Sequence, residues 1–410
     1  MTERMDALML PLNWQRVRLG DIAEIIGGGT PSTQITSFWN GSINWFTPTE
    51  IGITKYVYKS QRTITPLGLK KSSAKLLPIG TILLTSRASI GDCAILKVVA
   101  TTNQGFQSLI PLEKINNEFL YYLMLTLKNK LLKLASGSTF LEVSPNKIKN
   151  LLIPLPPLNE QIAIANILSD VDRYLYSLDA LILKKESVKK ALSFELLSQR
   201  KRLKGFNQAW QRVRLGNIGI TISGLVGKTK QDFINGNAKY ITFLNVLNNV
   251  IIDTSILENV KIYPNEKQNS FRKYDLFFNT SSETPKEVGM CAVLLDDIDQ
   301  VFLNSFCFGF RIFDKAVDGL FLSYLINSEI GRKAFENLVQ GSTRYNLSKS
   351  GFNNVCLFLP PLNEQIAIAN ILSALDNEIT SLKNKKSQFE NIKKALNHDL
   401  MSAKIRVLKK

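Results

Sequence analysis

The sequence is poor in the residues that most often carry out catalysis. Histidine occurs once in 410 residues, as His398. Ser–His–Asp catalysis, Cys–His catalysis and histidine-rich metal sites are therefore nearly excluded. Four cysteines (Cys93, Cys291, Cys307 and Cys356) lie far apart and form no Cys-x-x-Cys pair. We expect reduced thiols in the protein core, with no disulfide framework and no metal site.

Long hydrophobic runs are missing too. The longest apolar stretch, residues 119–127, is short and is interrupted by Thr126, so it cannot span a bilayer. The first residues, with Glu3, Arg4 and Asp6, lack the layout of a secretory signal. These features predict a cytoplasmic protein with no membrane partner.

Nucleotide-binding and catalytic motifs are also missing. Residues 224–229 resemble the end of a Walker A loop but have too few residues between their glycines. Residues 27–29 lack the Gly-x-Gly-x-x-Gly spacing, and Glu283 with Lys286 and Glu287 is too common a pattern to indicate a nuclease. No Asn-Pro-Pro-aromatic segment of the kind used to methylate bases is present. We therefore expect a binding protein rather than an enzyme, with no cofactor of its own.

Acidic residues are too few to balance the basic ones. The chain has 51 Lys and Arg against 34 Asp and Glu, which gives a net charge of +17 and a pI near 9.6. Such an excess indicates a polyanionic partner, nucleic acid first and an anionic membrane surface second. The alternative is a basic protein with neither partner. An apolar share of 45% is enough for real cores.

The sequence does contain a duplication. Residues 155–169 recur without a change as residues 359–373, an identity too long to arise by chance. Residues 14–20 likewise return as residues 210–216. The chain is therefore two tandem half-molecules of about 200 residues each. The ends of the halves are alike and their middles differ, which suggests a common fold and partner but different ligands.

Each half begins with a body of mixed secondary structure. Short apolar runs predict buried strands, and amphipathic helices are expected near residues 118–135 and 320–339. The strand patterns cover residues 43–46, 81–85, 240–244 and 276–279. This pattern predicts α/β globules.

A long helix with a heptad seam follows each body. Pro157 and Pro361 suit a first helical turn, where a missing N–H costs nothing. The seams predict that the two helices pair as an antiparallel coiled coil, a rod of roughly 50 Å with one body at each end. A kink is expected near residues 169–170 and 373–374. The alternative is that each helix packs on its own body.

The order of these features resembles the specificity subunit of type I restriction–modification enzymes. The resemblance rests on the doubled Leu-Pro-Pro-Leu-Asn-Glu-Gln motif, each copy followed by a long basic helix. It also includes the repeated opening segment and four further segments, at residues 28–31, 44–48, 102–106 and 278–289. The second body departs from the first, because it lacks the Gly-Gly-Thr-Pro loop and the Trp-x-Thr-Pro segment.

The resemblance implies an architecture and a role. The fold would be α/β, with two tandem target recognition domains separated by two long helices in an antiparallel coiled coil and related by a pseudo-twofold repeat. The regions would be domain 1 (1–154), spacer helix region 1 (155–205), domain 2 (206–358) and spacer helix region 2 (359–410). Each domain would read one half of a bipartite double-stranded DNA target. The chain itself would be non-catalytic.

The resemblance also implies partner subunits. Two methyltransferase (modification) subunits would dock on the helices, and restriction (motor-nuclease) subunits would join them. S-adenosylmethionine, ATP and magnesium are expected on those partners. The candidate docking residues lie at the two helix starts: Pro157, Glu160, Gln161, Pro361, Glu364 and Gln365.

Candidate DNA contacts follow from the chemistry of base edges. Arg suits guanine, Asn or Gln suits adenine, and Ser or Thr contacts bases less specifically. In the first body the candidates are Thr30, Ser32, Ser86, Arg87, Ser89, Asn103, Gln104, Ser138 and Thr139. In the second they are Ser281, Ser282, Lys286, Asn304, Ser342, Thr343, Arg344, Tyr345 and Asn346. Arg87 and Arg344 are the best motivated, since both flank short polar loops.

Two other classes of function stay open at this point. One is a stand-alone nucleic-acid enzyme such as a nuclease, against which the scarcity of histidine and the missing motifs weigh. The other is a coiled-coil adaptor that binds only proteins, against which the charge of +17 weighs.

Overall fold

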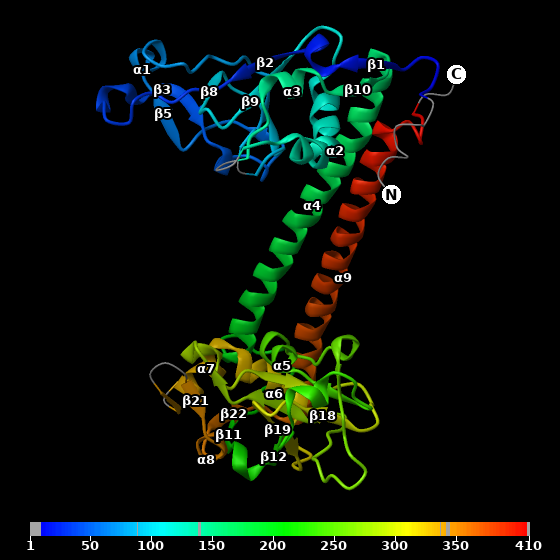
Figure 1. Ribbon diagram of the computed structural model, residues 1–410. Helices are drawn as coiled ribbons and strands as arrows, with labels where there is room; N and C mark the ends of the chain where they lie inside the picture. Colours follow the sequence, from blue (N-terminus) through cyan, green and yellow to red (C-terminus); the bar gives the residue numbers. More distant parts are fainter. Residues whose placement is uncertain (1–9, 88, 138–140, 337, 342–344, 408–410) are drawn as a thin grey trace. The chain divides into compact units, whose positions relative to one another are not determined.

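The computed structural model describes residues 10–87, 89–137, 141–336, 338–341 and 345–407. The chain divides into two compact units. The first unit comprises residues up to Asp179 together with those from Asn384 on, and the second comprises Ala180–Lys383. Each unit holds one globular body and a segment of each of the two longest helices (Figure 1).

The body of the first unit is built on a five-stranded sheet of order β2-β9-β6-β7-β4. A three-stranded sheet β5-β3-β8 and the pair β1-β10 complete it. The elements are β1 (Gln15–Arg18), β2 (Ala23–Gly27), β3 (Trp39–Phe46), β4 (Tyr56–Val57), β5 (Arg62–Ile64), α1 (Pro66–Lys70), β6 (Ile82–Leu84), β7 (Cys93–Leu96), β8 (Ala100–Thr102), β9 (Gln107–Pro111), α2 (Asn117–Leu134), α3 (Pro145–Lys149) and β10 (Leu152–Leu155).

The second body repeats this plan. Its four-stranded sheet β12-β19-β15-β17 corresponds to β2-β9-β6-β7, and its sheet β14-β13-β18 corresponds to β5-β3-β8. The elements are β11 (Gln211–Arg214), β12 (Gly219–Ser223), β13 (Ala238–Ile241), α5 (Phe243–Asn248), β14 (Glu258–Val260), β15 (Leu276–Asn279), β16 (Ser281–Ser282), β17 (Cys291–Val293), β18 (Val301–Leu303), β19 (Cys307–Ile312), α6 (Gly319–Asn327), α7 (Glu329–Glu336), β20 (Val339–Gln340), β21 (Tyr345–Leu347), α8 (Lys349–Asn353) and β22 (Cys356–Leu359). The predicted tandem α/β fold is confirmed.

Short apolar runs form the central strands, as the sequence predicts. Every residue of β6 and of β15 is buried, because both faces of these sheets are covered. In the first unit α2 lies between the sheet and the beginning of the long helix α4 (Figure 1). The Asn116 side chain caps α2 by accepting a hydrogen bond from Phe119 N at 2.9 Å.

One predicted helix is interrupted. The expected helix near residues 320–339 consists of two helices, α6 and α7, which Ser328 separates in an extended conformation. The Ser328 hydroxyl accepts a hydrogen bond from Gly331 N at 3.2 Å and so begins the second helix. The 3.6-residue apolar period continues across Ser328, and it therefore did not reveal the break.

The two longest helices are α4 (Leu158–Leu197) and α9 (Leu362–Met401), of 40 residues each. Neither is interrupted, so the predicted kinks near residues 169–170 and 373–374 are wrong. Serine and aspartate lower helix propensity by well under about 1 kcal/mol, and neither segment contains proline or glycine to break the helix. Ser169 instead accepts a hydrogen bond from Lys55 Nζ at 2.9 Å.

Ion pairs show that the helices run antiparallel within each unit. In the first unit α4 pairs with α9 through Asp179–Lys386 (2.6 Å) and Asp172–Lys393. In the second the pairs are Lys185–Glu378 (2.7 Å), Lys189–Asp376 (2.5 Å) and Glu186–Lys383 (2.6 Å). Residue numbers on α9 fall as those on α4 rise, from Asp172–Lys393 to Asp179–Lys386 in the first unit and from Lys185–Glu378 to Lys189–Asp376 in the second. The predicted antiparallel pairing is confirmed in both units.

Each helix also packs on a body. Ile164 and Leu168 of α4 belong to the core of the first unit, as do Leu400 and Met401 of α9. The sequence left two alternatives, that the helices pair with each other or that each packs on a body. Both occur, because each helix contacts the other helix and also a body. Among the described residues, no helix is both long and apolar enough to cross a membrane.

Candidate functional site

Backbone hydrogen bonds join separate segments of the first unit beyond the ends of its strands. Gly29 N donates to Thr102 O at 2.8 Å, and Ser86 N donates to Gly105 O at 2.8 Å. Val143 N then donates to Ser86 O at 3.0 Å. We call the joined segments, residues 28–32, 85–87, 102–106 and 141–143, the first loop cluster.

The first loop cluster brings several predicted contact residues together. A Cβ atom at Gly28 would lie 1.8 Å from Asn103 O, so this close approach requires glycine. Thr30 Oγ1 donates a hydrogen bond to Gln104 Oε1. Asn103 Oδ1 accepts from Gly105 N at 2.8 Å, which holds its side chain within its own loop. Gln104 is exposed and Thr30 is partly exposed.

The other candidates of the first body differ in exposure. Ser32 and Ser89 are exposed, and Arg87 is 41% exposed while its Nε donates to Glu142 Oε2 at 3.1 Å. Ser86 is fully buried (0% exposed), so its hydroxyl is not positioned for a contact with DNA. The sequence pattern suggests a loop residue, but the hydrogen bonding of β6 continues past Leu84 through Thr85 and Ser86. Ser138 and Thr139 lie outside the described residues.

The second unit repeats the same hydrogen-bond framework. Leu225 N donates to Leu303 O at 2.8 Å, as Gly29 N does to Thr102 O. Thr280 N donates to Phe306 O at 2.9 Å, and Leu347 N donates to Thr280 O at 2.9 Å. The corresponding segments, residues 224–228, 280–288, 303–307 and 345–347, form the second loop cluster.

All the described candidates of the second body lie in this cluster. Ser281 and Ser282 form β16, which pairs with Asn346 and Tyr345 of β21. Asn304 Oδ1 accepts from Phe306 N at 2.8 Å, the same bond that Asn103 makes in the first unit.

Exposure separates these second-body candidates. Lys286 and Asn346 are exposed, whereas Ser281 is buried like Ser86. Ser282 donates to Glu287 Oε2 at 2.8 Å. Ser342, Thr343 and Arg344 lie outside the described residues.

No candidate contact was predicted in one loop of the second cluster, residues 224–228. A Cβ atom at Gly224 would lie 2.3 Å from Asn304 O, so Gly224 is the counterpart of Gly28. The Walker-like residues 224–229 therefore begin a loop in the place of Gly-Gly-Thr-Pro. Lys228 within it donates to Lys261 O at 2.6 Å and pairs with Glu266. Spacing could have revealed this loop, because Gly28 and Gly224 follow Trp14 and Trp210 at the same distance.

The duplicated helix starts have an internal role in both units. Gln161 accepts from Asn116 N at 2.9 Å and donates to Pro156 O at 2.9 Å. Gln365 does the same with Asp318 N at 2.9 Å and Pro360 O at 2.7 Å. Each glutamine thus ties a helix start to the loop that precedes α2 or α6.

The duplicated glutamates are anchors as well. Glu160 accepts from Arg406 Nε at 2.8 Å and from Trp14 Nε1 at 3.1 Å, and Glu364 accepts from Arg202 Nε at 2.8 Å. The side chains of Glu160, Gln161, Glu364 and Gln365 are each 1% exposed. They are therefore not available to a docked partner in this structure, unlike the exposed Pro157 and the partly exposed Pro361.

Buried ionisable groups join each body to the helices. Tyr122 of α2 donates to Asp172 Oδ2 of α4 at 2.5 Å, and Tyr324 of α6 donates to Asp376 Oδ2 of α9 at 2.7 Å. Burial, reinforced by these carboxylates, raises the pKa of both phenols, so they stay protonated donors. Beside Tyr122, burial lowers the pKa of the Lys55 amine against the opposing effect of Glu118. These groups fix the packing and form no acid–base pair facing a cavity.

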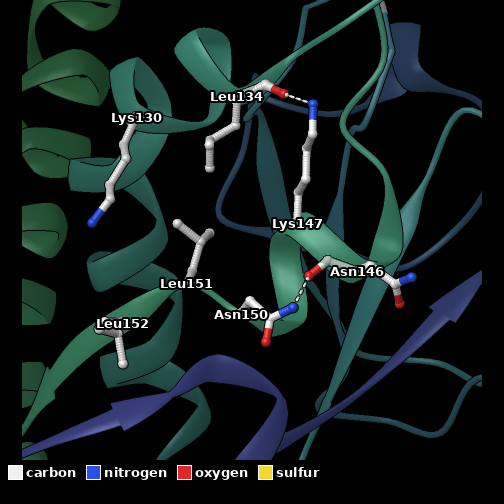
Figure 2. Close-up of a pocket in the computed structure, with 7 residues that line it drawn as sticks. All are labelled: Lys130, Leu134, Asn146, Lys147, Asn150, Leu151 and Leu152. Atoms are coloured by element: carbon white, nitrogen blue, oxygen red, sulfur yellow. Dashed lines mark hydrogen bonds between the residues drawn. The ribbon is translucent and has the colours of Figure 1, made fainter.

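A pocket in the first unit has no set of catalytic side chains in its lining. This pocket, of about 430 Å³, lies between α2, α3 and β10, and Figure 2 shows its lining. That lining is Lys130, Leu134, Asn146, Lys147, Asn150, Leu151 and Leu152, and contains no carboxylate, thiol or imidazole. Lys147 Nζ is engaged with Leu134 O at 2.8 Å. No group of three or more His, Cys, Asp or Glu in the described ranges could hold a metal ion.

The cysteines are mostly core residues. Cys93, Cys291 and Cys307 are buried free thiols, and Cys356 is partly exposed. Burial raises the pKa of Cys93 to about 12 and that of Cys291 and Cys307 further, so these three thiols stay protonated.

Two stretches of the chain match the family model described as the type I restriction modification DNA specificity domain. The matched residues are 11–185 and 207–391, which take up most of the chain and give each half one copy. The chain belongs to this family. Each copy of the specificity domain includes a body with its loop cluster and much of the helix that follows.

Relatives of known function bear similar names. The chain is 31% identical over 299 residues to the type I restriction enzyme MjaIX specificity subunit of Methanocaldococcus jannaschii, covering 68% of each chain. It is 27% identical over 423 residues to the MjaVIII specificity subunit of the same organism, covering 99% of this chain and 96% of that one. These names agree with the prediction of a non-catalytic specificity subunit.

Solved structures show the same fold. The type I restriction–modification S subunit from M. genitalium superposes with a TM-score of 0.59 at 18% identity, covering 96% of this chain and 97% of that one. The HsdS subunit from Thermoanaerobacter tengcongensis gives a TM-score of 0.52 at 18% identity, covering 99% and 100%. The arrangement of two specificity domains with long helices is thus a known fold.

Proposed function

We propose that the chain reads a two-part DNA sequence, one block with each loop cluster, with an unspecified gap between the blocks. The observation that carries this proposal is one backbone framework built twice with different exposed side chains on it. Ser32 and Gln104 are exposed in the first cluster, and Val226, Lys286 and Asn346 in the second. Different side chains on one framework favour two different blocks, so the target need not be palindromic.

Charge and side-chain chemistry support this reading of DNA. The net charge of +17 favours attraction to phosphates through release of counterions. Gln104 and Asn346 offer the carboxamide that pairs with adenine, and Arg87 offers the fork that pairs with guanine. Arg87 would have to share or exchange its bond to Glu142 on binding.

The gap would be set by the paired helices. Two reading surfaces can meet successive major-groove faces only if their separation suits the helical pitch of about 34 Å. Rigid helices favour one separation. The unbroken 40-residue runs of α4 and α9, and the ion pairs that fix their register in each unit, support such a spacer.

The chain would also recruit partners. We propose two methyltransferase subunits, joined by restriction subunits, with S-adenosylmethionine, ATP and magnesium bound by these partners. Because the buried glutamates and glutamines at the helix starts are occupied, docking would use the exposed apolar residues beside them. These are Leu158 (46% exposed), Ile162 (42%), Phe358 (54%) and Ile366 (39%), together with Pro157 and Pro361.

Methylation mapping tests the proposal. The chain is expressed with its modification subunits, and the methylated sites give the two blocks and their gap. Gel shifts then use duplexes in which only the gap length changes, one base pair at a time. We expect a sharp optimum. Equal affinity at every gap length would contradict the spacer, and cleavage of DNA by the chain with magnesium alone would contradict the non-catalytic role.

A further inference from the structure

The loop that follows the first sheet strand is held differently in the two units. In the first unit it comprises residues 28–32, between β2 and β3. Trp45 Nε1 donates to Gly29 O at 2.9 Å, and Trp39 Nε1 donates to Ser32 O at 3.0 Å. Both indoles are buried, at 3% and 7% exposure. The conformation of this loop is therefore fixed at both ends by N–H donors from one strand, β3.

The two indoles are themselves locked in place. Their rings meet edge to face, with centroids 5.0 Å apart. The guanidinium of Arg62, on the neighbouring strand β5, lies 3.7 Å from the centroid of the Trp39 ring. A Cβ atom at Gly29 would lie 2.3 Å from Ala74 N, so the loop backbone packs directly against the segment that follows α1. Neither the indoles nor the loop can shift alone.

The second unit lacks this arrangement. Tyr240 occupies the place of Trp45, since Trp45 pairs with Arg62 and Thr101 while Tyr240 pairs with Glu258 and Phe302. Its hydroxyl donates to Glu258 Oε2 at 2.8 Å and is therefore engaged on the neighbouring strand.

Carboxamides hold the second loop instead. Gln268 accepts from Val226 N at 3.1 Å and donates to Val226 O at 2.7 Å. Asn269 donates to Ser223 O at 3.0 Å, and Lys228 pairs with Glu266. The segment after β14 thus fixes the backbone of residues 223–228, just as β3 fixes the backbone of residues 28–32.

We propose that Trp39 and Trp45, and in the second unit Gln268 and Asn269, are positioning residues that set the specificity of one DNA block each. They would not touch DNA. They would act by fixing the backbone of a loop in one loop cluster. The sequence specificity at each block would then depend on the residues of one unit only. This inference rests on the proposed function, because it takes the two loop clusters as the reading surfaces.

Two matched variants test it. Trp45→Phe removes an indole N–H but keeps an aromatic ring. Gln268→Met has a side chain of similar length and removes both carboxamide bonds to Val226, together with the bond to Glu266. Each full-length variant is assembled with its modification subunits. Binding is measured on duplexes that carry single base-pair changes in one block or the other.

We expect each variant to lower sequence discrimination at one block and to leave the other block unchanged. Trp45→Phe should lower discrimination at the first block by about two- to tenfold, as expected for one lost hydrogen bond, and leave the second block unchanged. Gln268→Met should do the reverse. The inference is overturned if either variant weakens all duplexes by the same factor, alters the block of the other unit, or changes neither block.

Controls separate this inference from its premise and from simple unfolding. If the unaltered complex shows no preference in either block, the proposed function itself fails. If Trp45→Phe does not fold, Trp39→Phe and Gln268→Met carry the test. A fall in melting temperature with discrimination kept at both blocks would indicate a structural role only and would also overturn the inference.

Discussion

At the scale of single residues, the duplicated motif stabilises each unit from within. The two glutamates and two glutamines of the helix starts are buried and make equivalent bonds in both halves. Each glutamate binds an arginine that follows the end of the other helix: Arg406 follows α9, and Arg202 follows α4. A repeated surface motif would suggest only a docking site, whereas its burial adds a structural reason for the repetition.

Removing one of these arginines should be costly. Arg406→Met leaves the Glu160 carboxylate buried, with the Trp14 indole as its remaining side-chain partner among the described residues. We expect a loss of about 2–3 kcal/mol, below the usual range for a broken buried pair because Arg406 is 32% exposed. Urea unfolding followed by tryptophan fluorescence measures it. Arg406→Lys is the control, and it should lose less because it keeps the charge.

Acid should weaken the second loop through Glu266. Its hydrogen bond from Lys228, aided by Gln268, lowers the pKa of Glu266 from 4.5 to about 2. A lowered pKa in the folded state stabilises the fold above pH 4.5, and this contribution is lost as the pH falls from 4.5 towards 2. The stability difference between the protein and Glu266→Gln should therefore shrink over this range. Thermal unfolding at a series of pH values checks it, and a constant difference would contradict it.

At the scale of elements, the charges on the long helices define a pairing pattern. In the first unit, acidic Asp172 and Asp179 of α4 face basic residues of α9. In the second, basic Lys185 and Lys189 of α4 face acidic residues of α9, while acidic Glu186 faces Lys383. Single pairs at such partly exposed sites contribute little, roughly 0.2–1 kcal/mol each. Several in one register favour that register over a shifted one.

A charge swap should measure how much the Asp179–Lys386 ion pair itself contributes to the free energy of unfolding. Asp179→Lys places a second positive charge opposite Lys386. We expect the free energy of unfolding to fall by about 1 kcal/mol, and this loss should shrink at high salt. The double variant Asp179→Lys with Lys386→Asp should recover most of it. Urea unfolding at low and high salt provides the measurement, and no recovery would mean that the pair is not coupled.

At the scale of the whole molecule, two specificity domains share one chain and one excess of positive charge. The frameworks are alike while the loops are held by different side chains, indoles in one unit and carboxamides in the other. Under the proposed function, this division separates what must stay constant, the fold and its contacts with the helices, from what can vary, the proposed reading surface.

The net charge predicts a steep dependence of DNA binding on salt. With about 6–10 phosphate contacts, affinity should fall by about 10³–10⁵ between about 50 and 200 mM salt. Duplexes with and without the target blocks should show similar slopes, since phosphate contacts carry no sequence information. Fluorescence anisotropy over this range measures both. Binding that does not change with salt would instead favour an adaptor that binds only proteins.

The sequence by itself determined the duplication, the α/β bodies, the antiparallel helices and the family, because repeated motifs and apolar periods are local and survive in one dimension. It also located most segments of the two loop clusters. It did not reveal the break at Ser328 or the continuity of α4 and α9, since these depend on small propensity differences that packing outweighs. Tertiary structure alone decided that Ser86 and Ser281 are buried and that Glu160 and Gln161 are internal anchors. Those outcomes depend on hydrogen bonds between segments far apart in the chain, which no local pattern records.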